Sequence, residues 1–301
     1  MVGPAGEYEV DSPPMAEAVG EFLAFLTQRG ASTNTISAYR RDLQQLARSV
    51  KTGRTGRRGP ALGRAAIEAF VTDLQGRGYR DASIARKLAA VRSFFVFLTA
   101  EGSVSANPTD GFALPRVARP LPRLISTVEV ERLLRQPSGS SREAKRDRAM
   151  LELLYATGMR VSEFVSLDTG DIDLDKGNPH VRCRGRRGEE RTMFIPARAR
   201  EALVDYLESG RPQLVRNGDK QALFLNRRGG RLTRQGLWLI LKEYANEAGL
   251  SADITPHTLR HSFAAQMLES GMPLSSVQQL LGHTALSSTR VYSTLSNSAG
   301  T

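Results

Sequence analysis

The sequence predicts a mainly α-helical protein with a small antiparallel β-sheet, an α+β fold divided into two domains. Apolar residues recur at helical spacing through most of the chain, and three strand-like runs flank a glycine-rich turn in the second half. A proline-rich stretch at 102–123 separates the two halves. With 301 residues, 40% of them hydrophobic and 24% charged, the chain is long and apolar enough to form two cores.

The first half predicts a loose arm at 1–15 and a four-helix domain at 16–101. The arm contains prolines and shows no periodicity. The predicted helices run from about Ala16 to Gln28, from Ser32 or Thr33 through Leu46, around Ile67–Leu74 and from Ser83 through Leu98. A basic, glycine-rich loop, Lys51–Gly59, joins the second helix to the third.

Residues 102–123 predict an extended basic linker, because prolines alternate there with arginines that include Arg116 and Arg119. The second domain then covers 124–301. Its predicted helices lie after Ser126 and at about 145–157, 198–215, 233–249, 256–269 and 273–281. Its predicted strands are Asp171–Leu174, His180–Cys183 and Thr192–Ile195, with a tight basic turn before the last.

Charge indicates the class of partner. Lys and Arg total 42 against 31 Asp and Glu, a net charge of +11. This excess favours nucleic acid first and an anionic membrane surface second, with simple solubilisation as the alternative. No apolar run approaches the ~20 residues that span a bilayer. The N-terminus is also unlike a signal peptide, so we expect a cytoplasmic protein that does not bind membranes. A single cysteine, Cys183, excludes an internal disulfide and a cysteine metal cluster.

One short stretch already suggests phosphate binding. Thr255 and Pro256 are typical of a helix start, and His257 and Arg260 then share one face of the helix. A His beside an Arg at a helix N-terminus suits a phosphate, although a surface helix with a capping histidine is the simpler alternative.

His257 and His261 also have the spacing of a zinc pair on a helix. The residue after the first histidine is Thr258, so the glutamate base of that metal motif is absent. We therefore predict no metal and no other cofactor, and keep a zinc hydrolase built on His257, His261 and His283 as an alternative.

Four stretches in order carry a family resemblance: Thr-Gly-Met-Arg at 157–160, His-x-x-Arg-His-x-Phe-Ala at 257–264, Leu-Leu-Gly-His at 280–283 and Val-Tyr at 291–292. This pattern resembles the tyrosine recombinase (phage integrase) family. Because no arm-binding domain is added, the chain most resembles the Xer-type members of that family. The resemblance implies a core-binding domain at 16–101 and a catalytic domain at 124–301. It also implies site-specific cleavage and rejoining of DNA through a 3′-phosphotyrosine, without ATP.

The resemblance implies a role for each matched residue. Tyr292 is the nucleophile. Arg160 and Arg260 hold the non-bridging phosphate oxygens. His257 assists proton transfer, and His283 hydrogen-bonds the phosphate. His261 has no role in this scheme and is expected to be structural.

The hairpin departs from the family pattern. The family places a lysine in this turn to protonate the leaving 5′-oxygen, whereas residues 184–191 here contain none. We expect Arg186 or Arg187 to take that place, although Arg donates a proton poorly. Lys176 reaching in from before the hairpin, or a weakened enzyme, are the alternatives.

The partner implied is a double-stranded DNA target site, bound by four protomers on two duplexes. The tetramer is a homotetramer or a heterotetramer with a sister recombinase. The segment after Tyr292 is short and polar, which leaves open whether it docks on a neighbour. Helical or linker side chains predicted to contact DNA are Arg40, Arg41, Arg86, Lys87, Arg116, Arg119 and Arg234. The predicted biological role is resolution of chromosome or plasmid dimers. The alternatives are a mobile-element integrase or transposon recombinase, and a sequence-specific DNA-binding protein that does not cleave.

Overall fold

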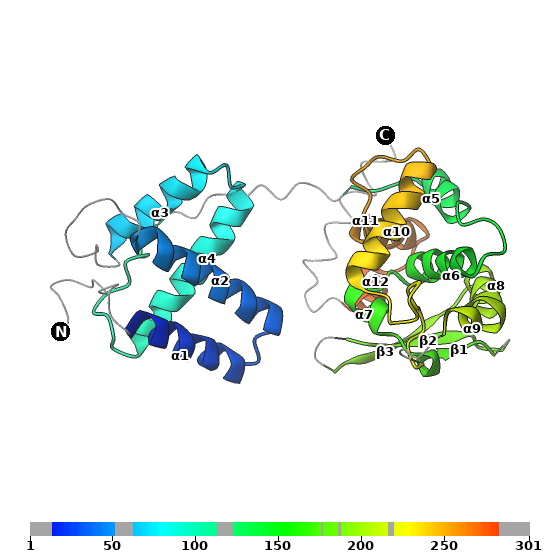
Figure 1. Ribbon diagram of the computed structural model, residues 1–301, viewed down its shortest axis with the longest axis horizontal. Coiled ribbons are helices and arrows are strands. Elements are labelled where there is room, and N and C mark those ends of the chain that lie inside the picture. Colours follow the sequence, from blue (N-terminus) through cyan, green and yellow to red (C-terminus); the bar gives the residue numbers. More distant parts are fainter. Residues whose placement is uncertain are drawn as a thin grey trace. The chain divides into compact units, whose positions relative to one another are not determined.

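The computed structural model describes residues 14–51, 63–112, 123–175, 177–185, 188–215 and 220–282. The chain divides into two compact units, Met1–Arg119 and Pro120–Thr301, here called the N-terminal and C-terminal units (Figure 1). Each has a hydrophobic core of its own. The predicted fold class, mainly helical with a small antiparallel sheet, is confirmed.

Four helices build the N-terminal unit: α1 (Pro14–Gln28), α2 (Thr33–Lys51), α3 (Arg64–Gly76) and α4 (Asp81–Ala100). Aromatic side chains fill its core, and the rings of Phe22 and Phe94 meet edge to face with centroids 5.5 Å apart. The last helix begins two residues before the expected start, Ser83, and the turn before it places Gly78 at a φ of 72°.

The first part of the predicted linker is folded, which corrects its boundary. Val104 is buried in the N-terminal core and Phe112 packs against the same core. Arg64 lies over the Phe112 ring, 5.5 Å from its centroid, and donates a hydrogen bond to the Asp110 carbonyl. Residues 102–112 therefore belong to the N-terminal unit. Burial of their apolar side chains stabilises this packing, although the prolines and glycines of the stretch are typical of a linker. The predicted contacts Arg116 and Arg119 lie outside the described residues, as do arm residues 1–13.

The C-terminal unit opens with two capped helices. Ser126 and Glu129 form a capping box at the start of α5 (Thr127–Leu134), and Ser141 caps α6 (Arg142–Thr157), which starts three residues earlier than predicted. The further helical elements are α7 (Val161–Ser166), η1 (Thr169–Asp171), α8 (Ala197–Asp205), η2 (Tyr206–Gly210), α9 (Arg211–Leu214), α10 (Arg234–Glu247), α11 (Pro256–Glu269) and α12 (Leu274–Leu281).

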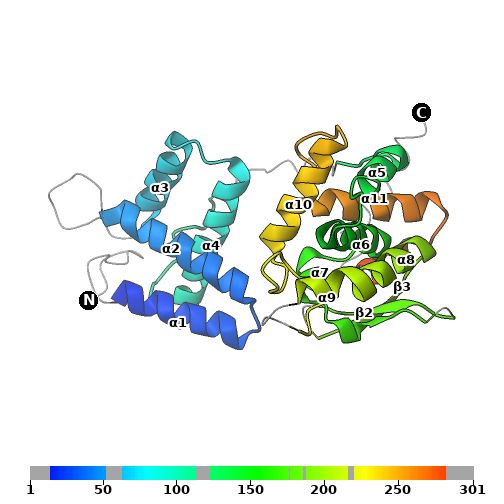
Figure 2. The same cartoon turned by 45° about the vertical axis from the view of Figure 1, so that its right-hand side comes forward.

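The sheet has three antiparallel strands in the order β1 (Ile172–Asp173), β2 (His180–Arg184) and β3 (Glu190–Phe194). It lies along one side of the helical part of the C-terminal unit in both views (Figures 1 and 2). In β2, buried residues alternate with exposed ones, so Val181 and Cys183 enter the core. The hairpin closes with Arg184 opposite Glu190.

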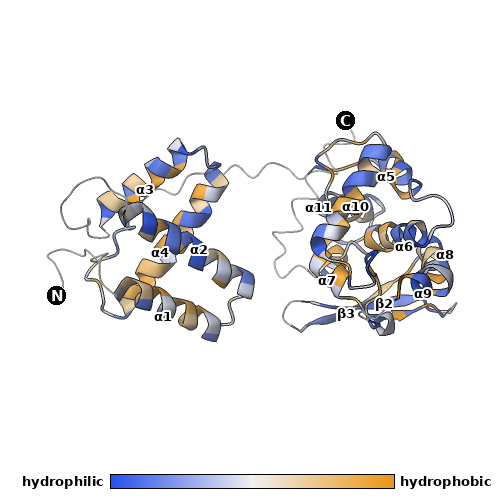
Figure 3. Ribbon diagram, in the orientation of Figure 1, coloured by the Kyte–Doolittle hydropathy of each residue, from blue (hydrophilic) through white to orange (hydrophobic). Residues whose placement is uncertain are grey.

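Apolar and polar residues are intermixed along the helices of both units, as amphipathic packing requires (Figure 3). In the C-terminal unit α6 is the central helix, and Met150, Leu151 and Leu153 on it are fully buried. Across the described ranges, no helix combines the length and the apolar character that spanning a membrane requires.

Candidate active site

The predicted phosphate ligand Arg160 lies in the tight connection between α6 and α7. Gly158 ends α6 in the left-handed conformation with φ at 55°, and a Cβ there would lie 2.5 Å from the Phe263 ring. Both the backbone conformation and the lack of space therefore require glycine. Two residues later Arg160 is the N-cap of α7, so its side chain leaves the backbone at a fixed point.

The second predicted phosphate ligand, Arg260, lies on α11 and is only 5% exposed. A capping box between Thr255 and Thr258 fixes the start of this helix. The terminal nitrogens Nη1 and Nη2 of Arg260 donate to the carbonyl oxygens of Gly158 and Leu281, each at 2.6 Å. These bonds hold α11 to the end of α6 and to the end of α12.

Three consecutive carbonyl oxygens at the end of α12 each accept a hydrogen bond from an arginine of a different element. They are Leu280 from Arg191 Nε (2.9 Å), Leu281 from Arg260 Nη2 (2.6 Å) and Gly282 from Arg160 Nη2 (2.5 Å). The last carbonyls of a helix have no partner within the helix, so these arginines satisfy them. The structure thus brings Arg160 and Arg260 together, directly before the position of His283 in the chain.

The carboxylate of Glu163 ties two of these arginines together. It accepts from the Arg160 backbone N–H (2.9 Å) and Nη1 (2.8 Å), and from Arg191 Nη2 (2.7 Å). Burial alone would raise the pKa of Glu163, but the hydrogen bonds from Arg191 and Arg160 outweigh it and lower the pKa to about 2. The carboxylate is therefore ionised throughout the neutral range.

Sequence reasoning missed Glu163 and Arg191. Glu163 stands at the third position of α7 after the N-cap Arg160, which is the position of the acidic member of a capping box. That pattern was a usable signal for Glu163. Arg191 had no local signal, because its two partners come from segments distant in the sequence.

The two histidines of α11 differ in environment. His257 is exposed near the start of the helix, whereas the His261 ring is half-buried, with the two ring centroids 6.4 Å apart. Burial first, and then the nearby charges of His257 and Arg260, lower the pKa of His261 to about 4. His261 is therefore neutral at pH 7.

His261 makes the stability of the C-terminal unit sensitive to acid. Its folded pKa lies below the ordinary value of 6.5, so between pH 6.5 and 4 the unfolded chain binds the proton more readily. The free energy of unfolding is therefore expected to decrease as the pH is lowered through that window. The decrease is at most ~1.4 kcal/mol per pH unit, and smaller to the extent that solvent screens the ring. His261→Gln removes this slope. Urea unfolding followed by the fluorescence of Trp238, the chain's single tryptophan, measures both proteins, and equal slopes would contradict the assignment.

Several predicted site residues lie outside the described residues: His283, Tyr292, Arg186, Arg187 and Lys176. The described base of the hairpin carries a salt bridge between Arg184 Nε and Glu190 Oε1 at 2.9 Å, with both side chains largely exposed. In the sequence, Arg186 and Arg187 stand between this pair.

The structure corrects one predicted DNA contact. Lys87 is only 6% exposed, and its Nζ donates to Asp42 Oδ1 (2.9 Å) and Gln45 Oε1 (2.6 Å). It is inside the N-terminal unit because adjacent residues of a helix point in different directions, and here the second of the basic pair faces the core. Its neighbour Arg86 is half-exposed but also binds Asp42.

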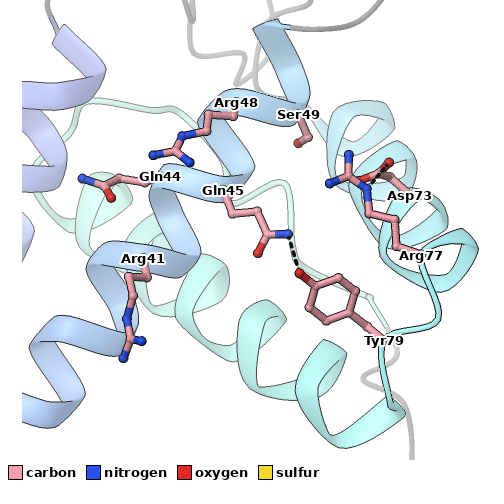
Figure 4. Close-up of a pocket in the computed structure, with 8 residues that line it drawn as sticks. All are labelled: Arg41, Gln44, Gln45, Arg48, Ser49, Asp73, Arg77 and Tyr79. Carbon is pink, nitrogen blue, oxygen red and sulfur yellow. Dashed lines mark hydrogen bonds and ion pairs between the residues drawn. The ribbon is translucent and has the colours of Figure 1, made fainter.

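The remaining predicted contacts that the structure describes, Arg40 and Arg41 on α2 and Arg234 on α10, are exposed. Arg41 lines a groove of the N-terminal unit with a cavity volume of about 410 Å³ (Figure 4). Across it, Gln45 on α2 points toward Tyr79, and its Nε2 donates to the Tyr79 hydroxyl at 3.3 Å. The full lining is Arg41, Gln44, Gln45, Arg48, Ser49, Asp73, Arg77 and Tyr79.

Among the residues with described positions, no three His, Cys, Asp or Glu side chains are grouped so that they could hold a metal ion. Of the zinc set considered from the sequence, His257 and His261 are described and His283 is not. Cys183 lies buried beneath the Arg191–Glu163 pair, and this burial raises the pKa of its thiol to about 12.

Comparison with known proteins gives consistent results along the whole chain. Residues 123–298 match the phage integrase family, and residues 19–102 match the phage integrase N-terminal SAM-like domain. The tyrosine recombinase XerC of Herpetosiphon aurantiacus is 48% identical over 285 residues, covering 94% of this chain and 92% of that protein. The tyrosine recombinase XerD of Halalkalibacterium halodurans is 41% identical over 273 residues, covering 90% and 91%.

Solved structures share the fold. The XerH site-specific recombinase bound to its difH substrate in a pre-cleavage complex matches with a TM-score of 0.75 and 20% identity, covering 98% of this chain and 99% of that one. A lambda integrase (75–356) dimer bound to a COC′ core site matches with a TM-score of 0.68 and 17% identity, covering 90% and 95%.

Proposed function

Because this chain belongs to the phage integrase family and is a Xer-type tyrosine recombinase, a site-specific enzyme that cleaves and rejoins DNA strands, we propose a role for each residue of its active site. Tyr292 is the nucleophile. Arg160 and Arg260 bind the non-bridging oxygens of the scissile phosphate. His257 assists proton transfer at the nucleophile, and His283 hydrogen-bonds the phosphate.

The reaction is a phosphoryl transfer in two reversible steps. The phenol oxygen of Tyr292 attacks the phosphorus and gives up its proton with the help of His257. The 3′-phosphotyrosine bond forms, the bond from phosphorus to the 5′-oxygen breaks, and the 5′-oxygen takes a proton from solvent to become a free hydroxyl. Negative charge grows on the non-bridging oxygens in the transition state, where two guanidinium groups stabilise it. The phosphotyrosine retains the energy of the broken bond, so rejoining requires neither ATP nor another cofactor.

One observation carries this proposal: the guanidinium groups of Arg160 and Arg260 bind consecutive carbonyls at the end of α12. They come from separate elements of the fold, yet both reach neighbouring carbonyls of α12, which supports their acting on one phosphate group. Each guanidinium has five N–H donors, more than its bonds to these carbonyls use. The bonds to α12 therefore orient the two groups and are compatible with phosphate binding.

A nicked duplex tests the nucleophile. When the 5′-hydroxyl fragment diffuses away after cleavage, the covalent protein–DNA adduct accumulates and is visible on a denaturing gel. The wild-type protein is expected to form the adduct, and Tyr292→Phe to form none while binding the same duplex with unchanged affinity, since only the attacking oxygen is lost. Absence of the adduct in the wild type would indicate a DNA-binding protein that does not cleave. An adduct in the Phe variant would assign the nucleophile elsewhere.

We propose that the hairpin turn stabilises the charge on the leaving 5′-oxygen. We assign this role to Arg186 or Arg187, which stabilise its charge by hydrogen bonding rather than by full proton transfer, since the pKa of Arg exceeds ~12. Lysine donates a proton more readily. We therefore expect Arg186→Lys or Arg187→Lys to accelerate adduct formation on DNA that keeps its natural 5′-oxygen as the leaving group. Unchanged rates in both variants would exclude this turn as the source of a rate-setting acid.

The substrate is a double-stranded DNA site bound by four protomers on two duplexes, formed either by this chain alone or with a sister recombinase. The relatives named XerC and XerD, and the XerH complex with its difH substrate, support this assignment. The net charge of +11 supports phosphate contacts in both units, with Arg40, Arg41 and Arg234 as exposed candidates. We assign the enzyme to resolving chromosome or plasmid dimers in the cytoplasm.

A further inference from the structure

Arg191, at the start of β3, is the most heavily engaged arginine of the site that lacks a role in the proposed mechanism. Its Nη2 and Nη1 donate to the two carboxylate oxygens of Glu163 at 2.7 and 3.3 Å, and its Nε donates to the Leu280 carbonyl at 2.9 Å. The side chain is only 12% exposed. It therefore joins the sheet, α7 and the end of α12 through one rigid, planar group.

Arg160 likewise joins Glu163 to the end of α12. It donates to the Glu163 carboxylate and to the carbonyl of Gly282, two residues beyond Leu280. Its side chain is 35% exposed, nearly three times as much as that of Arg191. Of the two guanidinium groups, that of Arg160 is the more exposed, and that of Arg191 lies deeper.

Both arginines come close to the backbone of Gly282. A Cβ at this position would lie 2.9 Å from Arg191 Nη1 and 3.3 Å from Arg160 Nη1, so glycine leaves the space that the two side chains use. Hydrogen bonds from both arginines, acting against the effect of burial, bring the pKa of Glu163 to about 2 and keep the carboxylate that links them charged.

We infer that Arg191 is a positioning residue for strand cleavage: it fixes the Glu163 carboxylate and the end of α12, and so holds the Arg160 guanidinium where it meets the scissile phosphate. This inference rests on the proposed role of Arg160. We assign Arg191 an action through Glu163 and no direct contact with the DNA.

Arg191→Gln tests the inference in the nicked-duplex assay under single-turnover conditions. We expect adduct formation to slow by about 100-fold, because a displacement of ~1 Å at a catalytic group has an effect of that size. The dissociation constant for the duplex should stay within about twofold of the wild-type value. The matched control is Arg211→Gln. Arg211 also donates to main-chain carbonyls, those of Lys220, Ala222 and Leu223, but within the described part of the chain it makes no hydrogen bond to Glu163 or α12. The control is expected to lose thermal stability and keep its cleavage rate.

A double variant separates positioning from charge compensation. Arg191→Gln combined with Glu163→Gln removes both charges and leaves no unpaired buried carboxylate. If both residues act through Arg160, the double variant cleaves no more slowly than the slower single variant. Recovery of the wild-type rate would mean that Arg191 only neutralises Glu163. Independent, multiplying effects would mean that the two residues act separately. Either outcome overturns the inference.

Arg191→Lys decides the question if the glutamine variant does not fold. Lysine keeps the charge but offers one nitrogen, which cannot bridge the carboxylate and the carbonyl as the guanidinium does. An intermediate cleavage rate supports the inference, whereas the wild-type rate contradicts it. Failure of the wild-type protein to form any adduct would count against the proposed function and not against Arg191 alone.

Discussion

Arg260→Lys is expected to slow strand cleavage by about 1,000-fold, the upper end of the effect of removing one transition-state donor. Arg260 fills a narrow position, with its terminal nitrogens bound to the Gly158 and Leu281 carbonyls and its side chain 5% exposed. A lysine ammonium has the charge but not the fork, so it cannot hold both carbonyls and also reach a phosphate. Burial further disfavours its charged form.

The rate of adduct formation per folded molecule measures this effect. Arg146→Lys is a suitable control, since Arg146 is a similarly buried arginine that binds Asp147 and the Leu225 carbonyl away from the proposed site. It should lower stability and leave the rate per folded molecule unchanged. A rate for Arg260→Lys within tenfold of wild type would show that Arg260 is a structural residue.

Asp42→Ala is expected to remove about 3–5 kcal/mol from the free energy of unfolding of the N-terminal unit. Asp42 is 1% exposed and accepts from both Arg86 and Lys87. Its removal leaves the Lys87 ammonium buried with Gln45 as its described hydrogen-bond partner. Unfolding followed by circular dichroism, with Trp238 fluorescence reporting the other unit separately, gives the measurement.

Two further variants interpret that result. Asp73→Ala breaks an exposed pair with Arg77 and should change stability by no more than about 0.5 kcal/mol. Adding Lys87→Met to Asp42→Ala removes the stranded charge and is expected to restore much of the loss. An equal decrease in the free energy of unfolding for the Asp42 and Asp73 variants would show that the buried ion pair stabilises the unit no more than the exposed one.

Local patterns were sufficient to predict most of the fold. The helix capped by Thr255 begins at Pro256 as predicted. The ends of the three strands lie within two residues of their predicted positions. Period and capping signals act over a few residues, so a single sequence contains them in full. The predicted start of α6, at about residue 145, was three residues late, because the helix is capped by Ser141 just upstream.

The errors came from contacts between distant segments. Lys87 appeared to be one of two basic residues on an exposed helix face, and only its pairing with Asp42 on another helix shows that it is internal. Val104 and Phe112 lie among prolines and glycines, which concealed their packing against the core. The pairing of Arg191 with Glu163 likewise depends on how β3 meets α7, which spacing does not encode.

The end of α12 has a consequence for how a polyanion approaches. Aligned peptide dipoles give the carboxyl end of a helix the equivalent of about half a negative charge, which repels phosphate. Three cationic side chains cover that end, with one anionic side chain, Glu163, between two of them. The local electrostatic potential is thereby reversed to positive, so an element with the wrong polarity for DNA becomes part of an attractive surface.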